Sequence, residues 1–183
     1  DNLYDKISPR YTRALARSMA HTKQVKAAGV LNSAFDTSVT GGDGKALCVT
    51  DHPLTNGGTL DNVAAADLNE TSLEDALISI AGFTDERGLI IALRGMKLII
   101  PRQLQFVAER LMASNMRPGT ADNDVNAVQS MGMLPNGYVI NDFLTDTDAF
   151  FIKTDAPNGL KHFERMAMAT AMDPDFETGN MRY

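Results

Sequence analysis

The sequence has few of the features that stabilise small secreted or membrane-embedded proteins. It contains one cysteine, no tryptophan and 7% aromatic residues among 183. The single thiol, Cys48, cannot form an internal disulfide and fits a reducing compartment. No apolar run approaches the roughly 20 residues of a membrane helix, and the chain begins at Asp1 without a signal peptide. We therefore expect a soluble protein, made inside the cell, that does not insert into a membrane.

A net positive charge is also missing. Seventeen lysines and arginines stand against 23 aspartates and glutamates, which gives a net charge of −6 and argues against a dedicated nucleic-acid-binding protein. The charges are unevenly distributed, because residues 6–35 contain six basic residues and no acidic one. Residues 36–183 contain 11 basic and 21 acidic residues. This polarity is typical of a protein with two dissimilar surfaces.

The strongest secondary-structure signal lies near the N-terminus. Ser8 and Pro9 predict a helix start, with an N-cap followed by proline at the first helical position. The spacing of apolar residues predicts a helix over 9–35, about 40 Å long, with Arg10, Arg13 and Arg17 on another face. So long a helix should project beyond its own core or lie along a neighbour. Its basic face has two interpretations, either simple solvation or weak, salt-sensitive contact with phosphate-rich cargo.

The rest of the sequence predicts short elements joined by turns rich in glycine and proline. Helices are expected from Ser72, with a Thr71–Glu74 capping box, from Pro101, and after Asp122 up to Gly132. Strands are expected over 46–50, 89–93, 97–100, 138–144, 149–154 and 176–183. Segments 138–144 and 149–154 have the pattern of a hairpin, and 160–172 is ambiguous between helix and strand. The absence of regular βαβ alternation predicts an α+β fold.

Two loops have partial matches to ligand-binding motifs. Gly41–Lys45 is similar to a phosphate-binding loop, but Val39 and Ala46 stand where that motif needs glycine and a hydroxyl residue, which favours a mobile turn. The second loop has Asp and Asn at 122, 124 and 126, the spacing of the first EF-hand calcium ligands. Alanine at 127 and methionine at 133 replace the required glycine and glutamate, so helix capping is the better explanation.

Residues for catalysis are scattered. Cys48 lies in an apolar segment, where it behaves as a small hydrophobic residue, and the three histidines, His21, His52 and His162, lack metal-ligand spacing. Asp51 beside His52 is more typical of a turn than of a catalytic triad. We therefore predict no catalytic, cofactor-binding or metal-binding residues, no cofactor and no enzymatic activity.

Many short motifs together resemble a family of tailed-bacteriophage major capsid proteins. Examples are Thr40-Gly-Gly-Asp-Gly44 and Gly82-Phe-Thr-Asp-Glu-Arg-Gly88. The similarity extends in order over residues 3–10, 14–19, 30–35, 40–44, 51–53, 82–88, 96–101, 117–124, 144–149, 151–155, 157–161 and 175–180. Each motif is weak alone, but so many in register argue against chance.

The resemblance implies an α+β Hong Kong 97-type capsid fold. Residues 1–44 would form a peripheral domain whose long spine helix covers about 9–35, and residues 45–156 would form a mixed α/β axial domain. Residues 157–183 would return to the peripheral domain as strands, which assigns 160–172 as strand. Family members also have an N-terminal arm and an extended loop before the region matched here, so we expect this chain to be a fragment.

The resemblance also implies a structural function. The chain would be a head-shell subunit that self-assembles into hexamers and pentamers of an icosahedral capsid enclosing double-stranded DNA. Its partners would be further copies of itself, non-specific packaged DNA on the inner face, and portal, scaffold or decoration proteins, with no membrane partner. It would occur in the virion, and in the host cytoplasm during assembly. Two alternatives stay open, an encapsulin-like nanocompartment shell and an unrecognised hydrolase that uses Cys48, Asp51 or His52.

Overall fold

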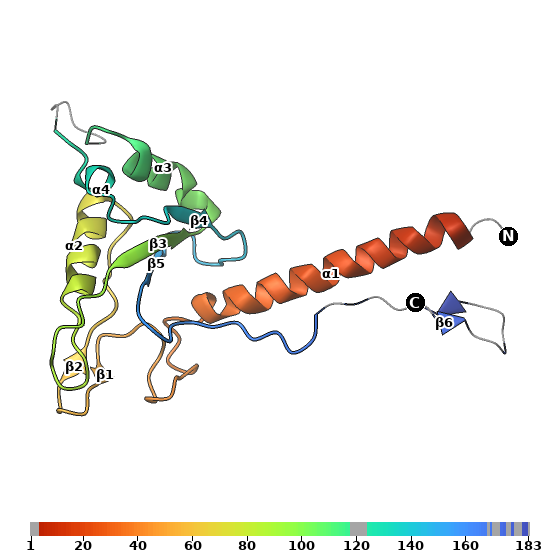
Figure 1. Cartoon of the computed structure of the whole chain (residues 1–183), viewed down its shortest axis with the longest axis horizontal. Helices are drawn as coiled ribbons and strands as arrows, with labels where there is room; N and C mark the ends of the chain where they lie inside the picture. The colour runs from red at the N-terminus through yellow and green to blue at the C-terminus, as the bar shows by residue number, and fades with distance from the viewer. Residues whose placement is uncertain are drawn as a thin grey trace. The chain divides into compact units, whose positions relative to one another are not determined.

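The computed structural model describes residues 4–117, 124–167, 169, 173–174, 177 and 181–182. The chain divides into two compact units (Figure 1). Unit 1 comprises residues 1–26 and 160–183, and unit 2 comprises residues 27–159. The secondary structure is a mixture of α and β, as predicted. No described helix combines the length and the apolar content needed to cross a membrane.

The chain alternates short strands with helices of very different length. The helices are α1 (Tyr4–Asn32), α2 (Glu70–Ala81), the 3₁₀ turn η1 (Arg102–Leu104), α3 (Gln105–Ala113) and α4 (Ala127–Ser130). The strands are β1 (His52–Pro53), β2 (Thr59–Leu60), β3 (Gly95–Ile100), β4 (Tyr138–Ile140), β5 (Phe151–Thr154), β6 (Asp173–Pro174) and β7 (Met181–Arg182).

Helix α1 occupies most of the region predicted as 9–35, but both of its ends differ from the prediction. It begins at Tyr4, so Ser8 is not its N-cap and Pro9 lies inside the helix. A proline here removes only one backbone hydrogen bond, close to an end whose first four N–H groups have no helical partner in any case. The helix ends at Asn32, because Ala34 N–H donates to Leu31 O at 3.1 Å and so tightens the last turn.

Strand β3 is the centre of unit 2. It pairs in parallel with β4 on one side and antiparallel with β5 on the other, so the sheet order is β4-β3-β5. Leu98 and Ile100 of β3 are fully buried. Helices α2 and α3 cover them with their own apolar faces. The buried core consists of Leu68, Leu73, Leu77, Leu98, Ile100, Ala108, Leu111, Val128 and Leu134.

The hairpin predicted from 138–144 and 149–154 is wrong, although both segments contain a strand. β4 and β5 flank β3 instead of pairing with each other. The ten residues between them are long enough to pass from one edge of β3 to the other. Because Leu98 and Ile100 are apolar, a paired strand at both edges keeps their backbone groups hydrogen-bonded inside the core.

Two predicted strands are absent. Residues 46–50 have no ladder; Cys48 N–H donates to Ala34 O at 2.8 Å, and Val49 bonds with Asn62 through both its N–H and its C=O. Residues 89–93 contribute only an isolated bridge between Thr84 and Ile90. Strand β3 begins at Gly95, two residues before the start predicted at residue 97.

The helix after residue 69 forms as predicted, but with a different cap. Asn69 is the N-cap of α2; its Oδ1 accepts from Ser72 N–H at 2.9 Å, while Ser72 Oγ accepts from Asn69 N–H at 3.0 Å. The capping box predicted at Thr71–Glu74 is therefore wrong by two residues. Leu73, Leu77 and Ile80 form the apolar stripe of α2, and all three are buried.

The later elements follow the predictions unevenly. Pro101 precedes η1 and α3, close to the predicted helix start. The short helix α4 is capped by Asn126, and the predicted capping residue Asp122 lies outside the described residues. Residues 161–167 contain no strand, which contradicts the strand assigned there, and most of 168–183 lies outside the described residues. Within that last stretch, β6 pairs antiparallel with β7.

Gly95 sits where no side chain fits. A Cβ at this position would lie 2.6 Å from Leu77 Cδ2, 3.1 Å from Ile152 Cγ2 and 3.2 Å from Leu134 Cδ2. We expect Gly95→Ala to lower the free energy of unfolding by about 1–3 kcal/mol, because three packed core side chains must shift. Urea unfolding measures the change, with Gly42→Ala as control, since nothing lies within 4 Å of that Cβ. Equal stability of the two variants would contradict this packing.

Asn126 is the one buried polar residue of the described core, at 1% exposure. Its Nδ2 donates to Leu111 O at 2.7 Å and to Ser114 O at 3.0 Å, and its Oδ1 accepts from Gln129 N–H. We expect Asn126→Ala to cost about 2–3 kcal/mol of unfolding free energy, because two carbonyl groups lose their partner. Asn69→Ala, which removes an exposed cap, should cost about 1 kcal/mol. Thermal unfolding that ranks the two variants in the opposite order would refute this assignment.

Candidate functional site

The structure tests the residues that a hydrolase would need. Asp51 and His52 are neighbours in the chain but do not form a pair: His52 Nδ1 lies 2.6 Å from Asp43 Oδ2, and Asp51 pairs with Lys45. Cys48 is half-buried, and burial raises the pKa of its thiol. A nucleophilic cysteine needs the opposite shift, toward the thiolate. The three candidates are thus not assembled into one site.

The Asp43–His52 pair is the nearest approach to a catalytic dyad. The hydrogen bond from His52 lowers the pKa of the Asp43 carboxyl group. The other ring nitrogen, His52 Nε2, is buried and has no hydrogen-bond partner in the described part of the chain. A triad needs a hydroxyl or thiol at that nitrogen. The pair instead joins the turn at 41–45 to strand β1, and sequence reasoning missed it because the partners are nine residues apart.

The glycine-rich turn is closed on itself. Gly41 N–H donates to Lys45 O at 2.7 Å, and Lys45 N–H donates to Asp43 Oδ1 at 3.1 Å. A phosphate-binding loop must instead point its N–H groups at the anion. With a carboxylate at its centre, this turn would repel phosphate. Residues 41–45 therefore form a turn, as predicted, and the predicted mobility stays a prediction.

Metal-binding groups are also not brought together. Among the described residues, no three His, Cys, Asp or Glu side chains lie in a group that could hold a metal ion. Asn126, in the calcium-like motif, uses its side chain in the core. Asp146 and Asp148 do lie side by side, and the hydrogen bond between their carboxyl groups lowers the pKa of Asp146 and raises that of Asp148.

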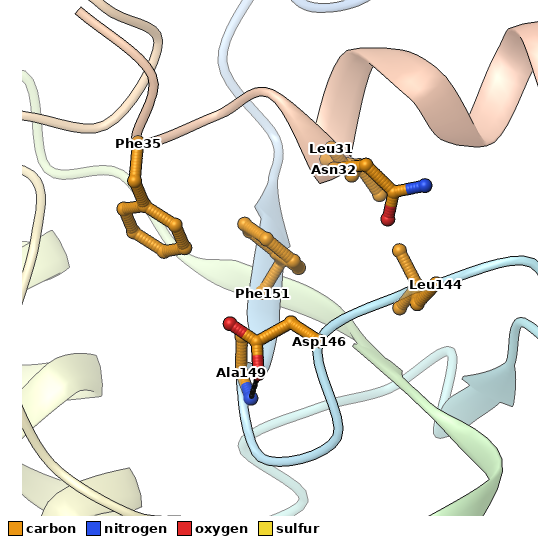
Figure 2. Close-up of a pocket in the computed structure, with 7 residues that line it drawn as sticks. All are labelled: Leu31, Asn32, Phe35, Leu144, Asp146, Ala149 and Phe151. Atoms are coloured by element: carbon orange, nitrogen blue, oxygen red, sulfur yellow. Dashed lines mark hydrogen bonds between the residues drawn. The ribbon is translucent and has the colours of Figure 1, made fainter.

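A small hollow in unit 2 lies between the last turn of α1 and the loop before β5 (Figure 2). Phe35 stacks on Phe151 with ring centroids 5.8 Å apart. Asn32 donates to Phe143 O and accepts from Thr145 N–H, both at 3.0 Å. The cavity volume is about 20 Å³, which fits a water molecule, whereas small-molecule sites occupy about 300–1,000 Å³. The hollow is therefore a structural junction that holds the end of α1.

Apolar surface is the most unusual property of unit 1. Within residues 9–26 of α1 no residue is buried, and only Thr12 and Ala16 are half-buried. Tyr11, Leu15 and Met19 are 72%, 57% and 49% exposed. In the other segment of unit 1, Leu160, Phe163 and Met166 are exposed as well. Unit 1 thus has no apolar core among its described residues.

Unit 2 also presents apolar side chains outside its core. Ile78, Leu89 and Ile90 are 70%, 64% and 71% exposed, at the end of α2 and in the hairpin that follows it. Contiguous exposed apolar residues mark surfaces that other molecules cover. The two units differ in charge, with nine basic and six acidic residues in unit 1, and eight basic and 17 acidic residues in unit 2. The structure thus offers surfaces for association.

The comparisons with known proteins agree with this description. A family model described as phage capsid protein matches residues 1–183. No curated protein matches the chain, and no solved structure does. Proteins of a capsid family are structural proteins of the bacteriophage virion and assemble into a shell. Because the match covers every residue, the chain belongs to the phage capsid protein family.

Proposed function

We propose that this protein is a major capsid subunit, which builds the head shell of a tailed bacteriophage around double-stranded DNA. The observation that carries the proposal is the distribution of apolar side chains. Among the described residues the core is confined to unit 2, while α1, Ile78 and the hairpin at 83–91 expose large apolar residues. A subunit that acts by association needs such surfaces, because covering them supplies the free energy of assembly.

The proposed fold is of the Hong Kong 97 type. Helix α1 would be the spine helix, residues 1–44 and 157–183 the peripheral domain, and residues 45–156 the axial domain. Two observations support this arrangement. The N-terminal and C-terminal segments share one unit, and the sheet β4-β3-β5 with α2 and α3 has a core of its own.

The shell would be built from hexamers and pentamers. Rings of five and six need heterologous contacts, in which two different surfaces of the subunit meet. Portal, scaffold or decoration proteins would bind to the same shell, and assembly would take place in the host cytoplasm. The opposite net charges of the two units favour contacts between unlike surfaces of neighbouring copies.

We also propose that the subunit has no catalytic, metal-binding or cofactor-binding residues. The dyad of Asp43 and His52 has no nucleophile at Nε2 in the described chain, and the pKa of Cys48 is shifted away from reactivity. Thiol-labelling kinetics test the hydrolase alternative directly. Labelling of Cys48 faster than that of an unstructured cysteine peptide would revive it.

The basic face of α1 is the proposed contact with packaged DNA. Arg10, Arg13 and Arg17 are exposed and form no ion pair in the described chain. On a helix with 3.6 residues per turn, all three lie on one face. Phosphate contacts from such a face are independent of the DNA sequence and weaken with salt. A shell that packages DNA of any sequence needs contacts of this kind.

Assembly is the first test of the proposal. We expect the full-length protein, purified after expression, to form closed shells in negative-stain images, because its exposed apolar surfaces favour association. Particles isolated from infected cells should contain nuclease-protected DNA, and shells with a protein cargo instead would favour the nanocompartment alternative. A protein that stays monomeric at high concentration would refute the shell function altogether.

The arginine face gives a second prediction. Particles with Arg10, Arg13 and Arg17 all changed to Gln should release DNA at lower salt, with the salt-dependence slope reduced by about 0.9 for each lost phosphate contact. The charge-matched control changes Arg102, Arg110 and Lys153 to Gln, three exposed residues of unit 2. Equal DNA release by both triple variants would show that α1 does not face the genome.

A further inference from the structure

The apolar residues of α1 form a continuous stripe on one side of the helix. Tyr11, Leu15 and Met19 follow each other at intervals of four residues, so they lie one above another. At 100° per residue, this stripe faces away from Arg10, Arg13 and Arg17. Helix α1 therefore has an apolar face and a basic face. The DNA contact proposed above uses only the basic face.

The apolar stripe is left open by the part of unit 1 that the structure describes. All three of its side chains are exposed, and no residue between 9 and 26 is buried. A helix gains most of its stability in water from packing such a stripe against another element. The ion pair between Lys23 and Glu164 is exposed on both sides and contributes little. The stripe requires a partner surface.

Unit 2 exposes apolar side chains of matching chemistry. Ile78 lies near the end of α2, and Leu89 and Ile90 lie on the hairpin at 83–91. The hairpin is fixed by its backbone: Asp85 Oδ1 accepts from Arg87 N–H at 2.8 Å and from Leu89 N–H at 2.9 Å, and Ile91 N–H donates to Phe83 O at 2.9 Å. Its apolar side chains are thus displayed on a rigid support.

A second contact joins the same hairpin to another loop of unit 2. Thr55 Oγ1 donates to Glu86 O and to Glu86 Oε2, both at 3.2 Å. This contact joins the hairpin to the loop between β1 and β2, and in Figure 1 the segment after α2 runs beside those strands. The backbone that holds Leu89 and Ile90 is therefore fixed before a partner binds.

The charges around the two surfaces are complementary. Asp75 and Glu86 are exposed acidic residues beside Ile78 and in the hairpin, where Arg87 is an exposed basic residue, and the unit as a whole has 17 acidic and eight basic residues. Lys26 lies on the side of α1 that carries the stripe, and unit 1 has an excess of basic residues. Attraction between the units would bring two copies together in this orientation and disfavour contacts between like surfaces.

We infer that the stripe of Tyr11, Leu15 and Met19 in one copy packs on the surface of Ile78, Leu89 and Ile90 in a second copy. The inference rests on the proposed shell function, and it identifies one of the heterologous contacts that a ring or shell requires. The partner is a second copy rather than DNA, because aliphatic side chains gain nothing from a phosphate backbone. Each copy gives one surface and receives the other, so the contact propagates from subunit to subunit.

Cysteine cross-linking between differently tagged copies tests the inference. In a Cys48→Ala background, one full-length chain has Leu15→Cys and the other has Ile90→Cys, and the two are mixed during assembly. Under mild oxidation we expect a disulfide dimer that contains both tags. It should form about tenfold faster or more than with Ala20→Cys in place of Leu15→Cys, because a shared interface raises the effective thiol concentration. Ala20 is an exposed residue on another side of α1.

The outcomes separate this contact from the shell function. Shells with fast mixed cross-links support the inference. Shells whose Leu15→Cys pair reacts no faster than the Ala20→Cys pair overturn it and leave the shell function intact. A disulfide within one chain, when Leu15→Cys and Ile90→Cys are combined in the same copy, also overturns it, and so does a dimer between two Leu15→Cys copies, since the stripe would then have another occupant. Absence of both shells and cross-links would overturn the shell function as well.

Discussion

Burial of β3 is the constraint on which the described structure depends. Among the strands whose burial is described, only β3 has buried residues, and Leu98 and Ile100, which share one face of the sheet, need cover on that face and a partner strand at both edges. Helices α2 and α3 contribute to the cover, β4 and β5 supply the edges, and Gly95 allows Leu77 of α2 to approach closely. The cover of β3 gives unit 2 its apolar core, whereas unit 1 has no core in its described part. The stability of α1 must therefore come from contacts outside its own helix.

Sequence patterns predicted the elements whose apolar residues face the chain's own core. The stripe of α2 and the run in β3 were found because helical and extended periodicities follow burial. The same reasoning failed at 89–93, where Leu89 and Ile90 are as apolar as core residues but are exposed. An apolar residue in the sequence indicates that its side chain is covered, but not whether the same chain or another molecule covers it. In a protein of a shell-forming family, this ambiguity is the main source of error.

Polar interactions were predicted least well, for a different reason. The pair of Asp43 and His52, the brace from Thr55 to Glu86, and the bonds of Asn126 to Leu111 and Ser114 all join residues that the fold alone brings together. Local chemistry predicted a turn at 41–45 and a cap near 126, but not these partners. Strand pairing failed similarly, because the pattern of β4 and β5 fits a hairpin equally well. Only the need to cover both edges of β3 decides between the two arrangements.

The two faces of α1 connect genome packaging to shell stability without any catalytic step. In the proposed arrangement, the arginine face binds phosphate through counterion release, which weakens as salt rises, whereas the apolar face binds by burial, which salt does not screen. The same helix would thus bind DNA through a contact that salt weakens. It would bind the neighbouring copy through a contact that salt does not screen. A shell that must release DNA while staying closed needs this difference, and the sequence of α1 provides it by placing arginines and aliphatic residues on opposite sides.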